Sequence, residues 1–353
     1  MNRLYINYKG IPEILNASYL PSIDGLRAIS ICIVILSHVL VGHGDPRLLS
    51  IFGSGHLGVL CFFVISGFLI TTLILKERVN TGTISLRKFY IRRFIRIFPV
   101  AYLYLLVLLL LKFFFHLDIY VFGLLAPALY IQNLNIINNP NPYTGHYWSL
   151  SVEEQFYLIF PLLQKIAKKT YGIVLLSCLC LDLLLKYSYY HVDWAAVKFL
   201  WGLIDNIDSI LIGCIIAVFL FVEIIPLQFI RKNKFILHIA CVALILLPHY
   251  LKAEFLKNSI IAVAFGIILI SNLMPSKDFI FRILNNRWMI KLGVLSYSLY
   301  IWQQLFMFSH FDVRIAGINV LGFPLNLLAL LLVSFVSYTY FEKYFLSLRR
   351  KFK

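Results

Sequence analysis

Charged residues, and acidic ones above all, are scarce in this 353-residue sequence. Asp and Glu number 16 against 32 Lys and Arg, and charged residues make up 14% of the chain, whereas soluble domains contain about 25%. Apolar residues make up 61%. No polar stretch is long enough to fold as a soluble domain, so the composition excludes an ordinary soluble enzyme and predicts a polytopic membrane protein.

Motifs for metals, redox chemistry and nucleotides are also missing. The six cysteines all lie in apolar runs, without the spacing of a zinc or redox site, which predicts packing residues. No cluster of histidines and carboxylates points to a metal, and the chain has neither a glycine-rich dinucleotide loop nor a Walker loop. The net charge of +16 lies in short loops between apolar runs, a pattern typical of membrane topology rather than of nucleic-acid binding.

Apolar runs of about the length that a bilayer requires of a transmembrane helix recur along the whole chain. They predict an all-α polytopic bundle of about ten transmembrane helices that forms one membrane domain over residues 1–353. Residues 119–132 are also apolar, but they are short and contain Gly123 and Pro127, so they fit either an eleventh span or a surface or re-entrant segment. The predicted spans are residues 24–43, 55–75, 98–116, 148–164, 172–187, 197–222, 235–250, 258–275, 290–310 and 318–341.

The basic residues predict how these spans are oriented. With ten spans and a cytoplasmic N-terminus, most Lys and Arg residues fall on the cytoplasmic side, whereas letting 119–132 cross places the later basic clusters on the wrong sides. Both termini are then cytoplasmic: segment 1–19, without a cleavable signal, and the basic tail 342–353. Loop 133–147, rich in Asn and Pro, faces outward. We expect contact with membrane lipids, and the oligomeric state stays open.

The first predicted span carries an ionisable stripe. His38 follows Arg27 by almost three helical turns, so both side chains face the same way, and Asp24 shares that face. Ionisable groups within a membrane helix are costly and by default indicate a functional site. Since Asp24 lies one turn before Arg27, we expect it to fix the guanidinium rather than to take part in chemistry.

The segment 87–99, RKFYIRRFIRIFP, places basic and aromatic residues just before the third predicted span. Arg93 and Arg96 share one helical face. This pattern fits a stop-transfer flank in contact with anionic lipids, and it also fits a phosphate clamp, because arginine forks match phosphate oxygens. The residue types alone leave both interpretations open.

Two adjacent carboxylates, Glu153 and Glu154, lie near the outer end of the fourth predicted span. Neighbours on a helix point about 100° apart, so only one of them can face the interior of the bundle. The depth inferred for Glu153 matches that of His38, which predicts a carboxylate–imidazole pair in which the carboxylate orients the ring. As an alternative, either Glu residue caps the start of its helix.

Other polar residues in the spans have two interpretations each. Ser66 follows the pattern of small packing residues and lacks the surroundings of a nucleophilic serine. Tyr297 and Gln303 belong to a polar stretch, GVLSYSLYIWQQ, that either lines a cavity or joins helices. His56 and His146 are expected in exposed loops, without a functional role.

The motifs IDGLRAIS, FFVISGFLIT, FYIRRFIRIFP, YWSLSVEEQFYLIFPLL and GVLSYSLYIW occur in this order along the chain. They resemble those of the acyltransferase family 3 integral-membrane proteins, bacterial enzymes that O-acetylate lipopolysaccharide O-antigen, exopolysaccharide and related glycans. The resemblance implies that Arg27 and His38 are the family's paired Arg and His. Its Arg-x-x-Arg element is then Arg93 and Arg96, and its acidic residue is Glu153.

The chain departs from the family pattern in two places. Many members have a histidine after the late Trp, where this chain has Gln303, so a second imidazole is absent there. Some members continue into an extracytoplasmic SGNH hydrolase-like domain, and this sequence ends before one, which predicts a one-component enzyme. We expect Trp148, Tyr297 and Gln303, with Ser66, to line or support the substrate cavity.

The resemblance implies an O-acetyltransferase of the bacterial cytoplasmic (inner) membrane. It would move an acetyl or other acyl group from cytoplasmic acetyl-CoA to a sugar hydroxyl of an envelope glycan or lipid-linked saccharide. The arginines would hold the donor's phosphates, and His38 would act as general base or carry the acyl group. A transporter or flippase of polysaccharide intermediates fits the same polytopic pattern, and a sensor or scaffold is a further alternative. The acceptor sugar and the acylated position stay open.

Overall fold

The computed structural model describes residues 6, 10–17, 19–43, 55–134, 136, 141–192, 194–249, 253–307, 314–315, 318–319, 323–348 and 351. These residues form two compact units. Unit 1 comprises Met1–Ser30, His56–Ile84 and Val152–Gly293, and unit 2 comprises Ile31–Gly55, Ser85–Ser151 and Val294–Lys353. Parts of the predicted segment 1–19, loop 133–147 and tail 342–353 lie outside the described residues.

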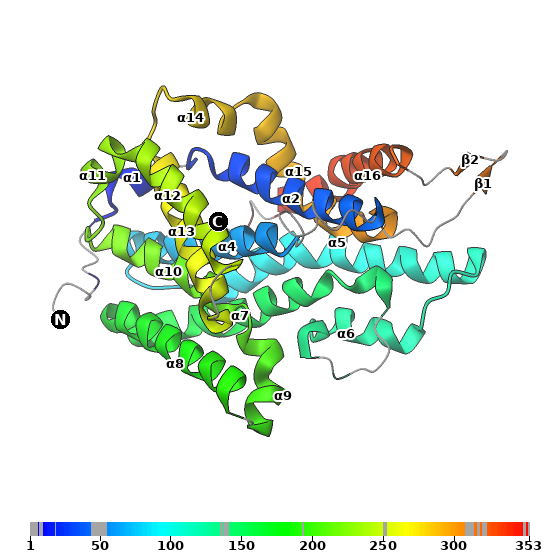
Figure 1. The fold of residues 1–353 in the computed structure, drawn as a ribbon, viewed down its shortest axis with the longest axis horizontal. Helices are drawn as coiled ribbons and strands as arrows, with labels where there is room; N and C mark the ends of the chain where they lie inside the picture. Colours follow the sequence, from blue (N-terminus) through cyan, green and yellow to red (C-terminus); the bar gives the residue numbers. More distant parts are fainter. Residues whose placement is uncertain are drawn as a thin grey trace. The chain divides into compact units, whose positions relative to one another are not determined.

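The described residues of unit 1 form helices and the loops that join them (Figure 1). In Figure 1, α12 and α13 run side by side. Helices α2 and α7 begin in one unit and end in the other, as does α15. The helices with residues in unit 1 are α1 (Glu13–Asn16), α2 (Ile23–His43), α4 (His56–Thr81), α7 (Tyr147–Ala167), η5 (Lys168–Thr170), α8 (Tyr171–His191), α9 (Ala195–Ile204), α10 (Ile207–Phe221), α11 (Leu227–Lys232), α12 (Lys234–Leu246), η6 (Leu247–His249), η7 (Glu254–Leu256), α13 (Lys257–Leu273), α14 (Phe279–Leu284) and α15 (Arg287–Met307).

Helices α4 and α10 form the most extensive helix pair of unit 1, and two glycines explain how closely they pack. A Cβ atom on Gly67 would lie 2.0 Å from the carbonyl oxygen of Ile210, and one on Gly213 would lie 2.1 Å from that of Val64. Because the atoms in the way are backbone, no side chain can move aside. The packing interpretation of the small residues in span 55–75 is confirmed at Gly67, since small residues let helix backbones approach.

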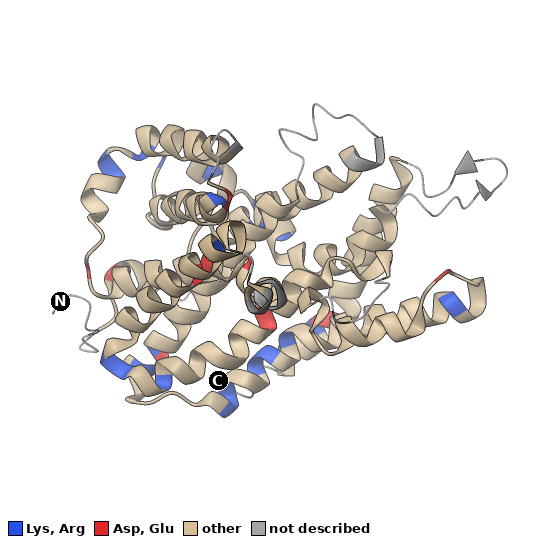
Figure 2. Cartoon of the chain, turned by 60° about the horizontal axis from the view of Figure 1, so that its bottom comes forward, with Lys and Arg blue, Asp and Glu red and all other residues tan. Residues whose placement is uncertain are grey.

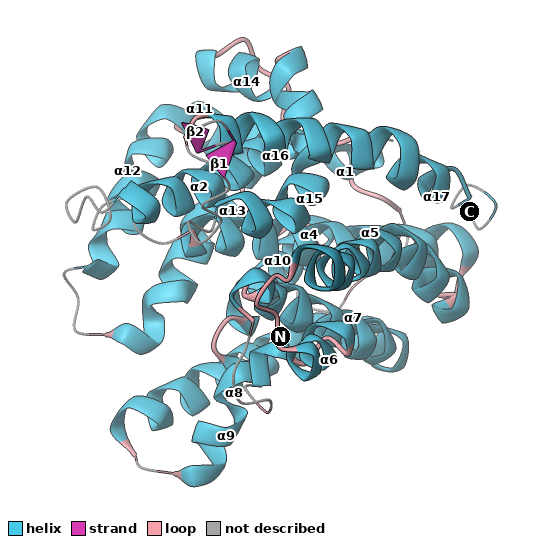
Figure 3. Ribbon diagram, turned by 90° about the vertical axis from the view of Figure 1, so that its right-hand side faces the viewer, coloured by secondary structure: helices cyan, strands magenta, loops and turns pink. Residues whose placement is uncertain are grey.

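Unit 2 contains the long helix α5 (Leu86–Phe115), the C-terminal two thirds of α15 and the last helices of the chain. Two-residue strands β1 (Arg314–Ile315) and β2 (Ile318–Asn319) pair antiparallel, and they are the strands drawn in Figure 3. The remaining elements are η2 (Val121–Leu124), α6 (Leu125–Ala128), η3 (Gln132–Leu134), η4 (Pro142–Thr144), α16 (Leu325–Val336), the π-helix η8 (Ser337–Glu342) and α17 (Lys343–Leu348).

Helix α5 begins twelve residues before its predicted span. Ser85 caps it by accepting a hydrogen bond from the backbone N–H of Lys88 at 3.4 Å. The arginine-rich segment 87–99 therefore continues directly into the apolar part of the same helix. Pro99 lies inside the helix, within the segment that joins the two parts.

Within the described residues, seven helical stretches are long and apolar enough to cross a membrane. One of them, 147–191, contains both α7 and α8, which the sequence predicts as separate spans. Helix α12 is shorter and apolar, and α15 carries several polar residues. Figure 2 shows how few charged residues the helices carry. The fold is thus an all-helical bundle apart from the short hairpin, while the count of ten spans and the sides of the termini stay predictions.

The apolar segment 119–132 breaks into short pieces, η2, α6 and the start of η3, none of which is long enough to cross a bilayer. Lys112 donates a hydrogen bond to the carbonyl of Ile119 at 2.5 Å. Asn141 forms two hydrogen bonds with the backbone of Tyr120, at 2.8 and 2.9 Å. These contacts tie the segment to α5 and to the loop before α7, all within unit 2.

Candidate active site

Asp24 and Arg27 form an ion pair in the first turns of α2. Asp24 Oδ1 lies 3.7 Å from an Arg27 terminal nitrogen, and the side chains are 17% and 16% exposed. Burial and the neighbouring Asp24 carboxylate raise the pKa of Tyr19 to about 12, so Tyr19 stays protonated beside the pair. The expected contact between Asp24 and the guanidinium is therefore present. At this end α2 packs tightly in unit 1, because a Cβ on Gly293 would lie 1.8 Å from the Asp24 carbonyl oxygen.

His38 lies in unit 2 with a fixed ring orientation. Its Nδ1 lies 2.8 Å from the carbonyl oxygen of Val34, one helical turn earlier. A carbonyl can only accept, so Nδ1 carries the proton in this bond and the lone pair of the neutral ring is at Nε2. The half-buried ring thus has the tautomer required of a base or nucleophile acting through Nε2.

His146 corrects the expectation of an exposed loop histidine, because it is only 4% exposed. Its ring lies within 5.6 Å, centroid to centroid, of the rings of Tyr104, Tyr147 and Tyr300. Burial first and repulsion from His38 second lower the pKa of His146 to about 3, so His146 is neutral at physiological pH. Unit 2 therefore contains a second histidine close enough to His38 to interact with it electrostatically.

A network of hydrogen bonds holds the loop that carries His146. Tyr104 donates from its hydroxyl to the Tyr143 carbonyl at 2.7 Å, and Gln304 donates from Nε2 to the Pro142 carbonyl at 2.9 Å. The hydroxyls of Ser149 and Tyr300 lie 2.5 Å apart. Helices α5 and α15 thereby fix the start of α7, because side chains from both helices reach the loop.

Glu153 belongs to unit 1, where two hydroxyl groups hold its carboxylate. Ser66 on α4 and Tyr157, one turn along α7, both donate hydrogen bonds to Glu153 Oε1. Charge-assisted hydrogen bonds of this kind are about twice as strong as neutral ones. Ser66 thus supports a carboxylate instead of serving packing alone. The predicted pairing of Glu153 with His38 stays a prediction, because the two residues belong to different units.

The arginine pair lies on α5 in unit 2. Arg93 and Arg96 are half-buried and one helical turn apart, and the Arg93 guanidinium lies 5.9 Å from the centre of the Phe89 ring. Tyr297 on α15 donates a hydrogen bond to the carbonyl of Ile97 at 2.6 Å, next to Arg96 in sequence. Tyr297 therefore has a supporting role that holds the arginine-bearing part of α5 against α15.

Gln303 is fully buried, and within the described part of the chain neither its amide oxygen nor its amide nitrogen has a hydrogen-bond partner. The hydroxyl of Ser296 and Nε1 of Trp302, on the same helix, share this property. A buried polar group left without a partner costs about 1–3 kcal/mol, so such groups are candidates to receive a ligand. Trp148 is half-buried at the start of α7.

Within unit 1 the structure brings together two pairs of predicted residues, Asp24 with Arg27 and Ser66 with Glu153. Sequence reasoning missed Val34, Tyr157 and the burial of His146. The first two follow from a signal that was available, since each lies four residues from its partner on a helix. The burial of His146 depends on tyrosines from distant segments, for which the sequence carries no local signal.

Comparison with known protein families shows which family the chain belongs to. The acyltransferase-domain family, Acyl_transf_3, matches residues 20–340. The chain belongs to acyltransferase family 3. That range includes every site residue that the sequence predicts, from Asp24 to Gln303.

Relatives of this acyltransferase family 3 chain include peptidoglycan O-acetyltransferase OatA of Listeria monocytogenes serovar 1/2a, 27% identical over 317 residues. That match covers 81% of this chain and 49% of the relative. O-acetyltransferase OatA of Staphylococcus aureus strain NCTC 8325 is 27% identical over 365 residues, covering 95% and 58%. An S. aureus strain COL protein that is named as an O-acetyltransferase is 31% identical over 332 residues. That match covers 84% of this chain and 52% of the relative. The chain spans about half the length of the curated relatives it matches. No solved structure matches the chain.

Proposed function

We propose that this protein is a membrane O-acetyltransferase that moves an acetyl group from acetyl-CoA to a sugar hydroxyl of a cell-envelope glycan. Family membership supports acyl transfer, and two relatives are named for O-acetyl transfer, one of them to peptidoglycan. The observation that carries the proposal is His38, a histidine in a membrane helix whose tautomer presents Nε2 as the basic atom. Lipopolysaccharide O-antigen and other envelope glycans are candidate acceptors alongside peptidoglycan.

In the proposed reaction, His38 Nε2 removes the proton from the acceptor hydroxyl while that oxygen attacks the thioester carbonyl carbon. The tetrahedral intermediate collapses, the C–S bond breaks, and the thiolate of CoA takes the proton from the imidazolium, leaving a sugar ester and free CoA. General base catalysis of this kind contributes about 10²–10⁴-fold in rate. A route in which the acetyl group first resides on Nε2 uses the same atom.

Arg27, Arg93 and Arg96 are proposed to bind the phosphates of the donor, because guanidinium groups match phosphate oxygens in two-pronged hydrogen bonds. The ion pair with Asp24 keeps Arg27 in place before the donor arrives. In unit 2, the unpartnered amide of Gln303 would form hydrogen bonds with a polar part of either substrate. The apolar helices would keep bulk water from the thioester, which otherwise hydrolyses.

The test is transfer by the purified full chain in detergent, with acetyl-CoA as donor and soluble peptidoglycan fragments as acceptor. Ester formation is read by mass spectrometry and NMR. We expect His38→Ala to lower transfer by about 10²–10⁴-fold while the protein stays folded. His191→Ala is the matched control, since His191 Nδ1 makes the same kind of bond, 2.9 Å to the Tyr187 carbonyl, on an exposed helix end. Folded protein that forms no ester and hydrolyses no acetyl-CoA would support a transporter instead.

A further inference from the structure

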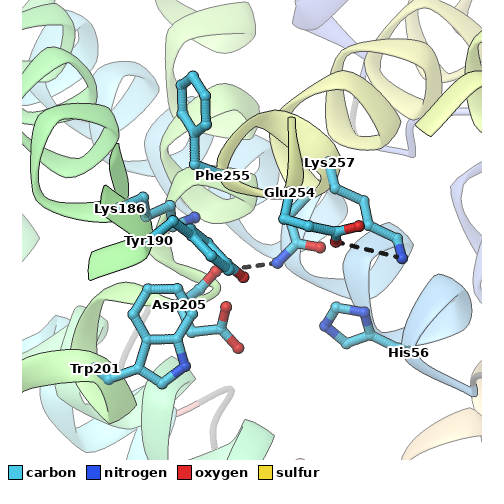
Figure 4. A pocket seen from close by; sticks show the side chains of 9 residues that line it. His56, Lys186, Tyr190, Trp201, Asp205, Glu254, Phe255 and Lys257 are labelled. Carbon is cyan, nitrogen blue, oxygen red and sulfur yellow. Dashed lines mark hydrogen bonds and ion pairs between the residues drawn. The ribbon is translucent and has the colours of Figure 1, made fainter. Parts of the chain in front are cut away.

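A pocket of about 130 Å³ opens in unit 1, and none of the candidate catalytic or donor-binding residues described above lines it (Figure 4). Four segments contribute to it: the start of α4, the end of α8, the junction of α9 and α10, and η7 with the start of α13. In Figure 4, Tyr190 and Trp201 lie on one side of the pocket, and His56 and Lys257 lie on the other. The positive-inside rule predicts that the segment ends carrying Lys186 and Lys257 face outward.

The pocket has a charged floor built from buried side chains. Lys186, which lines the pocket, is only 2% exposed, and its Nζ lies 2.8 Å from Asp208 and 3.3 Å from Asp182. Ser259 donates a hydrogen bond to the same Asp208 oxygen at 2.5 Å. Burying a lysine together with two carboxyl groups costs several kcal/mol before their mutual attraction is counted, so such a cluster is poor evidence of stability alone. In a membrane domain it indicates a function.

Aromatic rings form one wall of the pocket and are themselves held in place. Trp201 stacks on Tyr189 with ring centroids 3.6 Å apart, and Tyr190 meets Trp201 edge-on at 5.6 Å. These rings hold one another in place and form a flat apolar surface. Their side chains therefore lose little conformational entropy when a ligand binds. The C–H face of a pyranose ring is flat and apolar in the same way, while its hydroxyls point outward from the ring edge.

The polar groups around the aromatic wall suit hydroxyls. Asn258 donates hydrogen bonds to the Asp205 carbonyl at 3.0 Å and to Asn206 Oδ1 at 3.2 Å, and His56 Nε2 lies 2.6 Å from that same oxygen. Asp205 and Glu254 each place a carboxylate in the lining. Carboxylates and amides bind sugar hydroxyls well because they can accept or donate at several atoms.

The charge of the lining and the volume of the pocket restrict which class of ligand can bind. The lining and its floor hold four carboxylates, Asp182, Asp205, Asp208 and Glu254, against two lysines. Such a balance disfavours an anionic ligand such as the phosphate end of CoA, because like charges repel at close range. Pockets that bind drug-sized ligands have volumes of about 300–1,000 Å³. This pocket is smaller, at about 130 Å³, so we expect it to hold about one sugar ring.

We propose that this pocket binds one neutral pyranose ring of the acceptor glycan, with the ring stacked on Trp201 and its hydroxyls bound by Asp205. That the bound sugar belongs to the acceptor rests on the proposed function, whereas saccharide binding by the pocket does not. The pocket then acts as a docking site for the glycan, and it determines a preference for neutral over acidic sugars. Trp201 and Asp205 are binding residues that take no part in the chemical step.

The experiment measures saccharide binding to the full chain in detergent by saturation-transfer difference NMR. The probes are chitotetraose, a neutral sugar, and tetragalacturonate, an acidic one of similar length. We expect chitotetraose to bind and tetragalacturonate to bind at least tenfold more weakly. Trp201→Ala and Asp205→Asn should each weaken chitotetraose binding at least tenfold, and Trp201→Phe should restore most of it.

Trp194→Ala is the matched control, because Trp194 lies just before α9, is 56% exposed and is not part of the pocket lining. It should bind chitotetraose like the parent protein. Binding that Asp205→Asn and Trp201→Ala leave unchanged would overturn the proposal, and so would equal affinity for both probes or no binding at all. If binding depends on Trp201 but no ester forms in the transfer assay, the pocket assignment holds and the proposed function fails. If ester forms in the transfer assay but saccharide binding does not depend on Trp201, the pocket assignment fails and the proposed function holds.

Discussion

Glu153 provides the sharpest test of the candidate site, because two hydroxyl groups hold one of its oxygen atoms. Ser66→Ala and Tyr157→Phe each remove one donor to Oε1 while leaving the carboxylate in place. A hydrogen bond to a charged group contributes about 1.5–3 kcal/mol. If the carboxylate must be held still for catalysis, each variant should lower kcat/KM for acetyl transfer by about 10- to 150-fold, since about 1.4 kcal/mol corresponds to a factor of ten.

The double variant should lose less than the product of the two single losses, because Ser66 and Tyr157 act on the same oxygen. Steady-state transfer with varied acceptor gives these values, and Glu153→Gln sets the scale for loss of the charge. Glu154→Gln is the matched control, since that side chain points about 100° away around α7. Full activity in Ser66→Ala and Tyr157→Phe, together with an inactive Glu153→Gln, would refute the idea that these hydroxyls position the carboxylate.

Three further predictions address the donor, the buried histidine and helix packing. Replacing Arg93 and Arg96 by Ala should raise the KM for acetyl-CoA about tenfold or more with little change in kcat, and should abolish discrimination against 3′-dephospho-CoA in the same assay. The unfolded chain takes up a proton on His146 near pH 6.5, whereas in the folded chain its pKa is about 3, so stability falls as pH drops from about 7 towards 3. His146→Phe should flatten that dependence in thermal unfolding in detergent. Gly67→Ala should destabilise by about 1–3 kcal/mol or more, because the new methyl meets backbone, whereas Gly266→Ala meets only the tip of a side chain and should cost less.

Hydropathy predicted where most helices lie, because the bilayer requires long apolar runs. Predicted span 258–275 corresponds to Lys257–Leu273, and 24–43 corresponds to Ile23–His43. Hydropathy does not show local breaks where polar side chains find distant partners. Predicted span 197–222 contains Trp201–Phe221, which is long and apolar enough to cross a membrane, but the helix breaks inside it between α9 and α10. The break lies at Asp205 and Asn206, and the Asn206 side chain contacts His56 on another helix. Average hydropathy cannot show such a break, since it carries no information on which segments meet.

The candidate site shows the same limit. Asp24 and Arg27 are one turn apart on a helix, so their ion pair follows from spacing alone. The bond from Ser66 to Glu153 joins residues 87 positions apart and required the fold. His146 was assigned to an exposed loop because its neighbours in sequence are Asn, Pro and Gly, yet tyrosines of α5, α7 and α15 bury its ring.

The bond between His38 and Val34 also bears on the route of acyl transfer. Because the Val34 carbonyl holds the proton on Nδ1, both routes use Nε2, and an acetyl group carried by the enzyme would be an Nε2-acetylimidazole. Such a ring has no basic nitrogen left while Nδ1 keeps its hydrogen, so a second base would have to deprotonate the acceptor. His146 is neutral and shares unit 2, but its pKa of about 3 makes it a poor base. Direct attack by the acceptor with His38 as the base therefore requires fewer groups. Trapping with hydroxylamine in the absence of acceptor distinguishes the two routes, because only an acetylated enzyme releases acetohydroxamate in a burst equal to the amount of protein.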